Sequence, residues 1–208
     1  GLLLFILSRN LAKHHFEHWI TGGWAPTPVA QPNTDDDRNG NVIFLRALEW
    51  IIRHELGHLM RKHLDETGLL REDHFRREFE ADEAATRWMK GSHAPDPSRS
   101  PGAKPSFDEL LLENAAVGVF AGVVWISQFE CVPHPESHTH PDAASRLMKV
   151  LDLLDLREDS GALEIVSYAI KALIDPEGQW PDGAENPTAL DAAQDAAIQL
   201  SRFIQSNR

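Results

Sequence analysis

The feature that most constrains this chain is a pair of histidines, four residues apart, within a long predicted helix. The helix is expected to run from Asn41, a suitable N-cap, to Thr67, with Gly68 placed for a left-handed C-cap. Residues four apart on an α-helix lie about 40° apart around its axis, so His54 and His58 project from one face. Two imidazoles side by side can take two positions of a tetrahedral zinc ion.

Glu55 completes the pattern His-Glu-x-x-His. It is rotated about 100° from His54 around the helix axis, which is too far for easy chelation with both histidines. It is well placed to contact a metal-bound water, the position of a general base. Because the chain has 11 histidines, the pattern arises by chance with odds on the order of one in twenty, so a second element is needed.

A carboxylate pair on the next predicted helix supplies that second element. Glu78 and Asp82 are four residues apart and therefore share a face. We expect Glu78 to be the third metal ligand, and Asp82 to accept a hydrogen bond from the far nitrogen of a ligand histidine, most plausibly His54. The neighbouring Glu80 and Glu83 are interpreted as part of a solvated acidic face.

An apolar stripe follows the predicted active-site helix on the side roughly opposite the two histidines. We expect this stripe to anchor the helix against the rest of the protein. Its members are Leu45, Leu48, Ile52, Leu56 and Leu59.

A third element starts at His140, where the sequence matches His-Pro-x-x-x-x-Arg-Leu with Arg146 as its arginine. Together the three motifs span residues 54 to 147 and resemble gluzincin-type zinc metallopeptidases, in particular the HtpX-like, CAAX-prenyl-protease-like and Lit-type phage-exclusion peptidases. The second motif also resembles the ImmA/IrrE-type peptidases. The resemblance implies that His140 stabilises the tetrahedral oxyanion and that Arg146 orders the site.

The membrane-embedded families differ from this chain in one respect. HtpX and the prenyl-type proteases have several transmembrane helices, whereas the apolar run from Ala115 to Phe129 is 15 residues, about 22 Å as a helix. A buried core helix is the simpler interpretation of that run. A soluble relative, closest in outline to the Lit-type peptidases, therefore fits better.

Other residues leave alternatives open. His134, His138 or Tyr168 is able to take the place of His140 near the substrate. A second metal site at His14 and His18 is conceivable, although surface histidines on an amphipathic helix are the simpler interpretation. His63 is interpreted as a structural histidine, and packing is the preferred role for Tyr168.

The pattern as a whole predicts a mainly α fold of the zincin-like kind, as one domain over residues 1–208. Alternatively, the fold is α+β with a small N-terminal sheet, for which a strand around Thr27 to Ala30 is weakly signalled. Surface loops are expected at 92–106 and 175–187. The other predicted helices cover residues 2–20, 73–91, 107–129, 141–156, 162–174 and 188–204.

Composition bounds the partners and the compartment. The formal net charge of -12 disfavours binding to a phosphate backbone, so we expect no nucleic acid. A single cysteine, Cys131, fits a reducing, cytoplasmic location. The expected partners are Zn²⁺ and a protein or peptide substrate, with a membrane role unlikely. The expected activity is endopeptidase cleavage of a protein or peptide. By family analogy, the enzyme is expected to be a regulated effector of phage defence. The alternative is a non-catalytic regulatory or binding module with a structural zinc.

Overall fold

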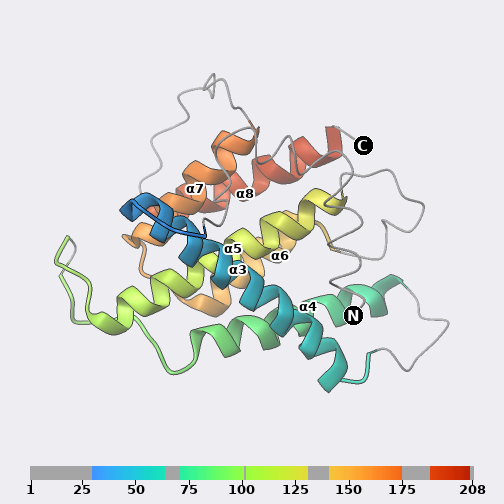
Figure 1. Ribbon diagram of the computed structural model, residues 1–208. Helices are drawn as coiled ribbons and strands as arrows, with labels where there is room; N and C mark the ends of the chain where they lie inside the picture. The colour runs from blue at the N-terminus through green and yellow to red at the C-terminus, as the bar shows by residue number, and fades with distance from the viewer. Residues whose placement is uncertain (1–29, 64–70, 101, 131–140, 175–187, 207–208) are drawn as a thin grey trace. The chain divides into compact units, whose positions relative to one another are not determined.

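The computed structural model describes residues 30–63, 71–100, 102–130, 141–174 and 188–206, and every regular element in these ranges is an α-helix (Figure 1). The predicted mainly α class is therefore confirmed. The strand suggested near residue 27 and the helix predicted over 2–20 lie outside the described residues. The helices are α3 (Asp35–Met60), α4 (Arg71–Lys90), α5 (Phe107–Glu130), α6 (Ala143–Leu154), α7 (Gly161–Ile174) and α8 (Ala189–Ser206).

The chain forms two compact units that divide after Phe44, within α3. In the first unit, the start of α3 is fixed by a capping box. The Asp37 N–H donates to the Thr34 hydroxyl at 3.0 Å, and the Thr34 N–H donates to the Asp37 carboxylate at 3.1 Å. The prediction that Asn41 caps this helix was wrong, because the capping box at Thr34 starts it seven residues earlier. The prediction of one domain over the whole chain stays a prediction.

Helix α3 also ends earlier than expected, at Met60 rather than Thr67. Lys62 takes the left-handed conformation (φ 59°), its N–H donates to the Leu59 carbonyl, and the His63 N–H donates to the His58 carbonyl. This pair of bonds is a Schellman motif, which satisfies the last carbonyls of a helix while reversing the chain. Gly68, the predicted left-handed residue, lies outside the described residues.

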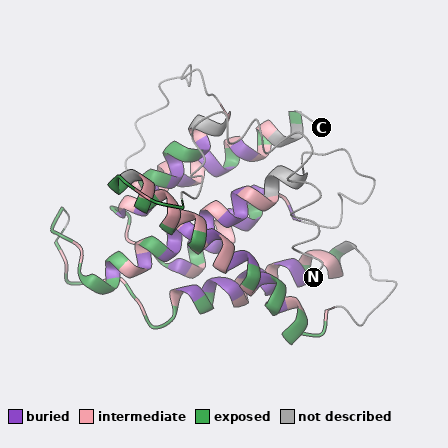
Figure 2. Ribbon diagram, viewed as in Figure 1, coloured by how far each residue is buried: buried purple, intermediate pink, exposed green. Residues whose placement is uncertain are grey.

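In the second unit, α5 is the central helix and packs on α4, α6 and α7. Its residues Ala116, Val119 and Val123 have no exposed surface, which is typical of a core helix (Figure 2). The stretch Phe107–Ile126 is long and apolar enough to cross a membrane, and 61% of its most apolar window is buried inside the protein. Helix α6 also packs on α4 and α8, and α7 packs on α8.

Two glycines let α5 approach α3 closely. A Cβ on Gly118 would lie 2.3 Å from the Arg46 Cβ, and a Cβ on Gly122 would lie 2.7 Å from the Trp50 ring. Such distances are well inside van der Waals contact, so a larger residue at either position forces the two helices apart. Glycine here is a packing requirement, and it buries the Trp50 face of α3.

The buried face of α3 is not the predicted one. Leu45, Ile52 and Leu59 are 60%, 45% and 56% exposed, and Leu56 is also exposed. Ala47, Trp50, Ile51 and His54 are buried instead. The prediction that the leucine stripe anchors the helix was wrong, because the interior of this unit receives the face that bears the histidines.

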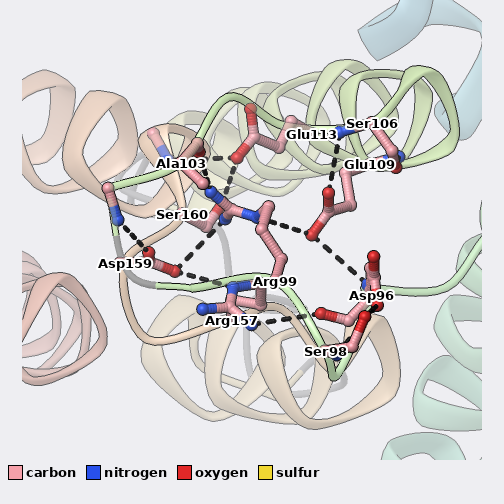
Figure 3. A network of polar contacts seen from close by, with 12 residues as sticks. Asp96, Ser98, Arg99, Ala103, Ser106, Glu109, Glu113, Arg157, Asp159 and Ser160 are labelled. Carbon is pink, nitrogen blue, oxygen red and sulfur yellow. Dashed lines mark hydrogen bonds and ion pairs between the residues drawn. The ribbon is translucent and has the colours of Figure 1, made fainter.

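A polar network connects the segment between α4 and α5 to the start of α5 and to the segment before α7 (Figure 3). Arg99 contacts the Glu109 carboxylate at 3.0 Å and the Asp159 carboxylate at 3.4 Å, and it also donates to the Ala103 carbonyl. Arg157 in turn donates to Asp159 at 2.9 Å. The predicted surface loop at 92–106 thus lies against the segment that leads into α7, while the loop predicted at 175–187 falls outside the described residues.

The remaining helix bounds differ from their predicted ends by a few residues. Helix α4 ends at Lys90, and Gly91 follows in the left-handed conformation (φ 57°), as a C-cap glycine requires. Helix α6 begins after Asp142, whose side chain accepts from the Ser145 N–H, and it ends at the left-handed Asp155.

Candidate metal centre

Within the second unit, helix α3 presents His54 and His58 on the face that packs toward the interior of that unit. The two Nε2 atoms lie 3.1 Å apart, and the rings meet edge to face at 4.7 Å between centroids. His54 is only 3% exposed and lies beside the ring of Trp50, whose Nε1 donates to the Thr86 hydroxyl. Both imidazoles therefore come from one helix, with His54 buried and His58 partly buried.

Helix α4 brings a carboxylate to the same point. One oxygen of Glu78 lies 3.5 Å from His54 Nε2, and the other lies 3.3 Å from His58 Nε2. The Glu78 side chain is 12% exposed. Three groups that commonly bind metal ions thus meet from two helices that are separate in the sequence.

The meeting depends on a close approach of the two backbones. Gly57 lies between the two histidines, and a Cβ placed on it would be 3.2 Å from the Cα of Ala81. Ala81 in turn lies between Glu78 and Asp82 on α4. Small residues at this crossing let the ligand-bearing turns of α3 and α4 come into register.

The spacing of these ligand atoms suits a tetrahedral ion. With metal–ligand bonds of about 2.0–2.1 Å, the donor atoms of a tetrahedral zinc site lie about 3.3 Å apart. The two imidazole Nε2 atoms lie 3.1 Å apart, and each lies 3.3–3.5 Å from a different oxygen of the Glu78 carboxylate. Two histidines and a glutamate also form one of the ligand sets that catalytic zinc uses.

Asp82 supports His54 from the opposite side of its ring. Its Oδ1 lies 2.8 Å from His54 Nδ1. Arg146 of α6 grips the same carboxylate with two bonds of 2.8 and 2.7 Å, and both residues are fully buried. This arrangement directs the Nδ1 proton of His54 to Asp82 and leaves Nε2 facing His58 and Glu78.

Charges and burial act against each other in this group. Burial disfavours the charged form of His54, but contacts with Asp82 and Glu78 outweigh it and raise its pKa to about 9. Burial likewise disfavours ionised Asp82, but the Arg146 guanidinium outweighs it and lowers the pKa of that carboxyl. A metal ion at this point therefore competes with a proton on His54.

His58 has a different partner on its outer side. Its Nδ1 lies 3.0 Å from Nδ1 of His63, and His63 Nε2 lies 3.2 Å from a carboxylate oxygen of Glu80. Burial lowers the pKa of His63 despite that carboxylate. His63 and Glu80 were interpreted from the sequence as a structural histidine and a solvated carboxylate, and both interpretations missed this contact.

The sequence carries little signal for these two residues. Residues five apart on a continuous helix are separated by about 140° around its axis, so His58 and His63 would not meet if α3 ran to Thr67. They meet because the helix ends at Met60 and the chain reverses at Lys62. A lysine does not predict such a turn, because glycine or asparagine is the usual residue at a left-handed position.

The other predicted site residues fall into two groups. Glu55 is exposed on α3 and is not one of the three clustered donors. Tyr168, for which packing was predicted, is 74% exposed on α7, so that prediction was wrong. His140, His134, His138, His14, His18 and Cys131 lie outside the described residues.

Comparison with known proteins gives the family. The family model for Peptidase U49 matches residues 3–166, which include α3 and α4, the two helices of the candidate metal centre. The chain belongs to the Peptidase U49 family. The match therefore places the clustered histidines and glutamate in a family of peptidases.

A curated relative and a structural search complete the comparison. The chain is 28% identical over 148 residues to a protein named "Cell death peptidase" from Escherichia coli (strain K12). The matching region covers 67% of this chain and 42% of that protein, so the chain spans less than half of the relative's length. No solved structure matches this member of the Peptidase U49 family.

Proposed function

We propose that this chain is a zinc-dependent endopeptidase of the gluzincin type, with His54, His58 and Glu78 as metal ligands. The observation that carries the proposal is a cluster from two helices, in which the imidazole Nε2 atoms lie 3.1 Å apart and each lies 3.3–3.5 Å from one oxygen of the Glu78 carboxylate. A solvated acidic face gives no reason for a carboxylate to converge on two imidazole nitrogens. Membership of a peptidase family supports a hydrolytic use for that cluster.

Glu55 is the proposed general base. It follows the ligand His54 directly in the sequence, yet its side chain is exposed and free of the ligand cluster. Zinc, when bound, polarises the scissile carbonyl and lowers the pKa of a water to about 7. The Glu55 carboxylate accepts the proton of the attacking water and returns it to the leaving amine.

His140 and Arg146 have supporting roles in this proposal. His140 donates a hydrogen bond to the developing oxyanion, a contribution typically worth about 3 kcal/mol. This role rests on the His-Pro-x-x-x-x-Arg-Leu resemblance alone. The role of Arg146 rests also on its two bonds to the carboxylate that orients His54.

A non-catalytic module with a structural zinc is the competing function. Structural zinc sites have four protein ligands, whereas catalytic sites keep one position open for water or substrate. Within the described ranges, the cluster of possible ligands has three members, and a fourth histidine, cysteine or carboxylate does not join it. The presence of Glu55 favours the catalytic proposal, because a purely structural site needs no base beside its ligands.

A regulated role in phage defence is proposed from the resemblance of the three motifs to the Lit-type phage-exclusion peptidases. The similar protein from Escherichia coli is named "Cell death peptidase". A peptidase that kills its own cell has to stay inactive until it is triggered. We propose the same regulated use and a cytoplasmic location for this chain, with a protein or peptide as substrate.

Glu55→Gln tests the catalytic proposal directly. We expect the variant to keep about one zinc per chain by elemental analysis, because Glu55 is not a ligand, and to lose cleavage of a quenched-fluorescence peptide library. Glu164→Gln, the same change on an exposed residue of α7, is the matched control and is expected to leave both unchanged. Loss of zinc from Glu55→Gln, or full cleavage by it, contradicts the assignment.

A further inference from the structure

The turn that follows α3 places a second histidine behind a metal ligand. His63 is the residue after the left-handed Lys62, and its N–H closes the Schellman motif on the His58 carbonyl. In this motif the side chains at the positions of His58 and His63 frequently meet. Their ring centroids are 5.1 Å apart, and the facing Nδ1 atoms are at 3.0 Å.

Helix α4 holds this turn at two points. The Arg77 guanidinium donates to the His63 carbonyl, which fixes the backbone of the turn. One helical turn along the chain, the Glu80 carboxylate lies 3.2 Å from His63 Nε2. Arg61 and Arg76 place guanidinium groups 3.6 and 3.9 Å from the Glu80 oxygens.

The chemistry of the contacts orders the protons along this chain of groups. A carboxylate only accepts hydrogen bonds, so the contact with Glu80 places the proton of a neutral His63 ring on Nε2. His63 Nδ1 is then an acceptor, and the group facing it at 3.0 Å, His58 Nδ1, must be the donor. With its proton on Nδ1, His58 has a free lone pair on Nε2, the atom that faces His54 and Glu78.

We propose that His63, oriented by Glu80, is the positioning residue for the metal ligand His58. The inference rests on the proposed metal site. His54 is oriented directly by Asp82, whose buried carboxylate is bound by Arg146. The two ligand histidines are thus supported by different means, one by a buried carboxylate and the other by a histidine–glutamate relay that reaches the surface.

The test is zinc affinity, measured by competition with a fluorescent zinc chelator. His63→Leu removes the Nδ1 acceptor and puts an apolar side chain in place of the imidazole ring. It is expected to weaken zinc binding by about 10–100-fold. His63→Asn offers an amide oxygen near the position of Nδ1 and is expected to recover most of that loss. Glu80→Gln is expected to weaken binding several-fold, since it keeps an acceptor without the charge.

Glu83→Gln is the matched control on the same helix, because Glu83 pairs with Arg87 and Lys149 and has no contact with His63 in the described structure. Melting of each variant in chelator separates a lost fold from a lost ligand. Nitrogen-15 NMR of labelled histidines is expected to show the His58 proton on Nδ1 in wild type and a mixture of tautomers in His63→Leu.

The possible results separate this inference from the proposed function. If wild type binds no zinc, or His54→Ala does not reduce its binding, the metal site itself fails. If wild type binds zinc through His54 but His63→Leu binds equally tightly, the relay alone is refuted. The relay is also refuted if His63→Asn binds as weakly as His63→Leu, since a purely structural histidine would give that result.

Discussion

Arg146→Met separates the charge on Arg146 from its size. The methionine side chain fills much of the same space but removes both bonds to Asp82, whose carboxylate has no exposed surface. His54 is then the only group of those named here that remains in contact with the carboxylate. Breaking a buried ion pair by removing one partner typically costs about 3–5 kcal/mol, because the other charge is left buried.

The assay is urea unfolding in the presence of a chelator, so that bound metal does not mask the loss. A cost in this range corresponds to a fall in Tm of roughly 10 °C for a chain of about 200 residues. The double variant Arg146→Met with Asp82→Asn removes the stranded charge as well. We expect it to be more stable than Arg146→Met alone by at least about 1 kcal/mol.

Two outcomes would refute this reasoning. A loss below about 1 kcal/mol in Arg146→Met would show that the buried pair does not carry its expected share of stability. A double variant that loses the sum of the two single changes would show that Arg146 and Asp82 act independently. Either result would remove the argument that Arg146 holds Asp82, and through it His54, in place.

Two more predictions concern the crossing of α3 and α4 and the charge on His54. Gly57→Ala places a methyl group 3.2 Å from the Ala81 Cα, so the two helices must separate by a few tenths of an ångström. We expect the zinc affinity of this variant to fall about tenfold or more. An unchanged affinity would contradict the close approach of the two helices. Because Asp82 and Glu78 raise the pKa of His54 to about 9, its protonation stabilises the metal-free fold fully below about pH 6.5, and that contribution is lost as the pH rises through 9. Urea unfolding in chelator is therefore expected to show a free energy of unfolding that is up to about 3 kcal/mol lower at high pH. Zinc binding is expected to strengthen over the same pH range. A free energy of unfolding that does not change with pH would exclude the raised pKa of His54.

The sequence by itself determined the local geometry of the candidate centre. Spacings of four residues place His54 with His58 on one face and Glu78 with Asp82 on another, because the helical repeat leaves no other arrangement. Apolar periodicity and turn residues likewise predicted the positions of α5 to α8 to within a few residues. These features depend on residues close together in the chain, and local rules suffice for them.

Only the tertiary structure decided which face of α3 is buried. The leucine stripe predicted an interior contact, but Leu45 and Leu59 are exposed while His54 is buried. Polar groups can occupy an interior when they satisfy one another, and the partners of His54 come from α4 and, through Asp82, from α6. The sequence pattern of α3 alone contains no information about those partners.

The tertiary structure also decided how each ligand histidine is supported. Arg146 reaches Asp82 across 64 positions of sequence, and His63 reaches His58 because α3 stops at Met60 and the chain reverses through a left-handed lysine. The close approach of Gly57 to Ala81 then sets the distance between the two ligand-bearing turns. Arg146 joins α6 to α4, Arg77 of α4 contacts the turn after α3, and Gly57 of α3 meets Ala81 of α4. Each feature therefore depends on packing between separate elements, which the pattern of one helix does not contain.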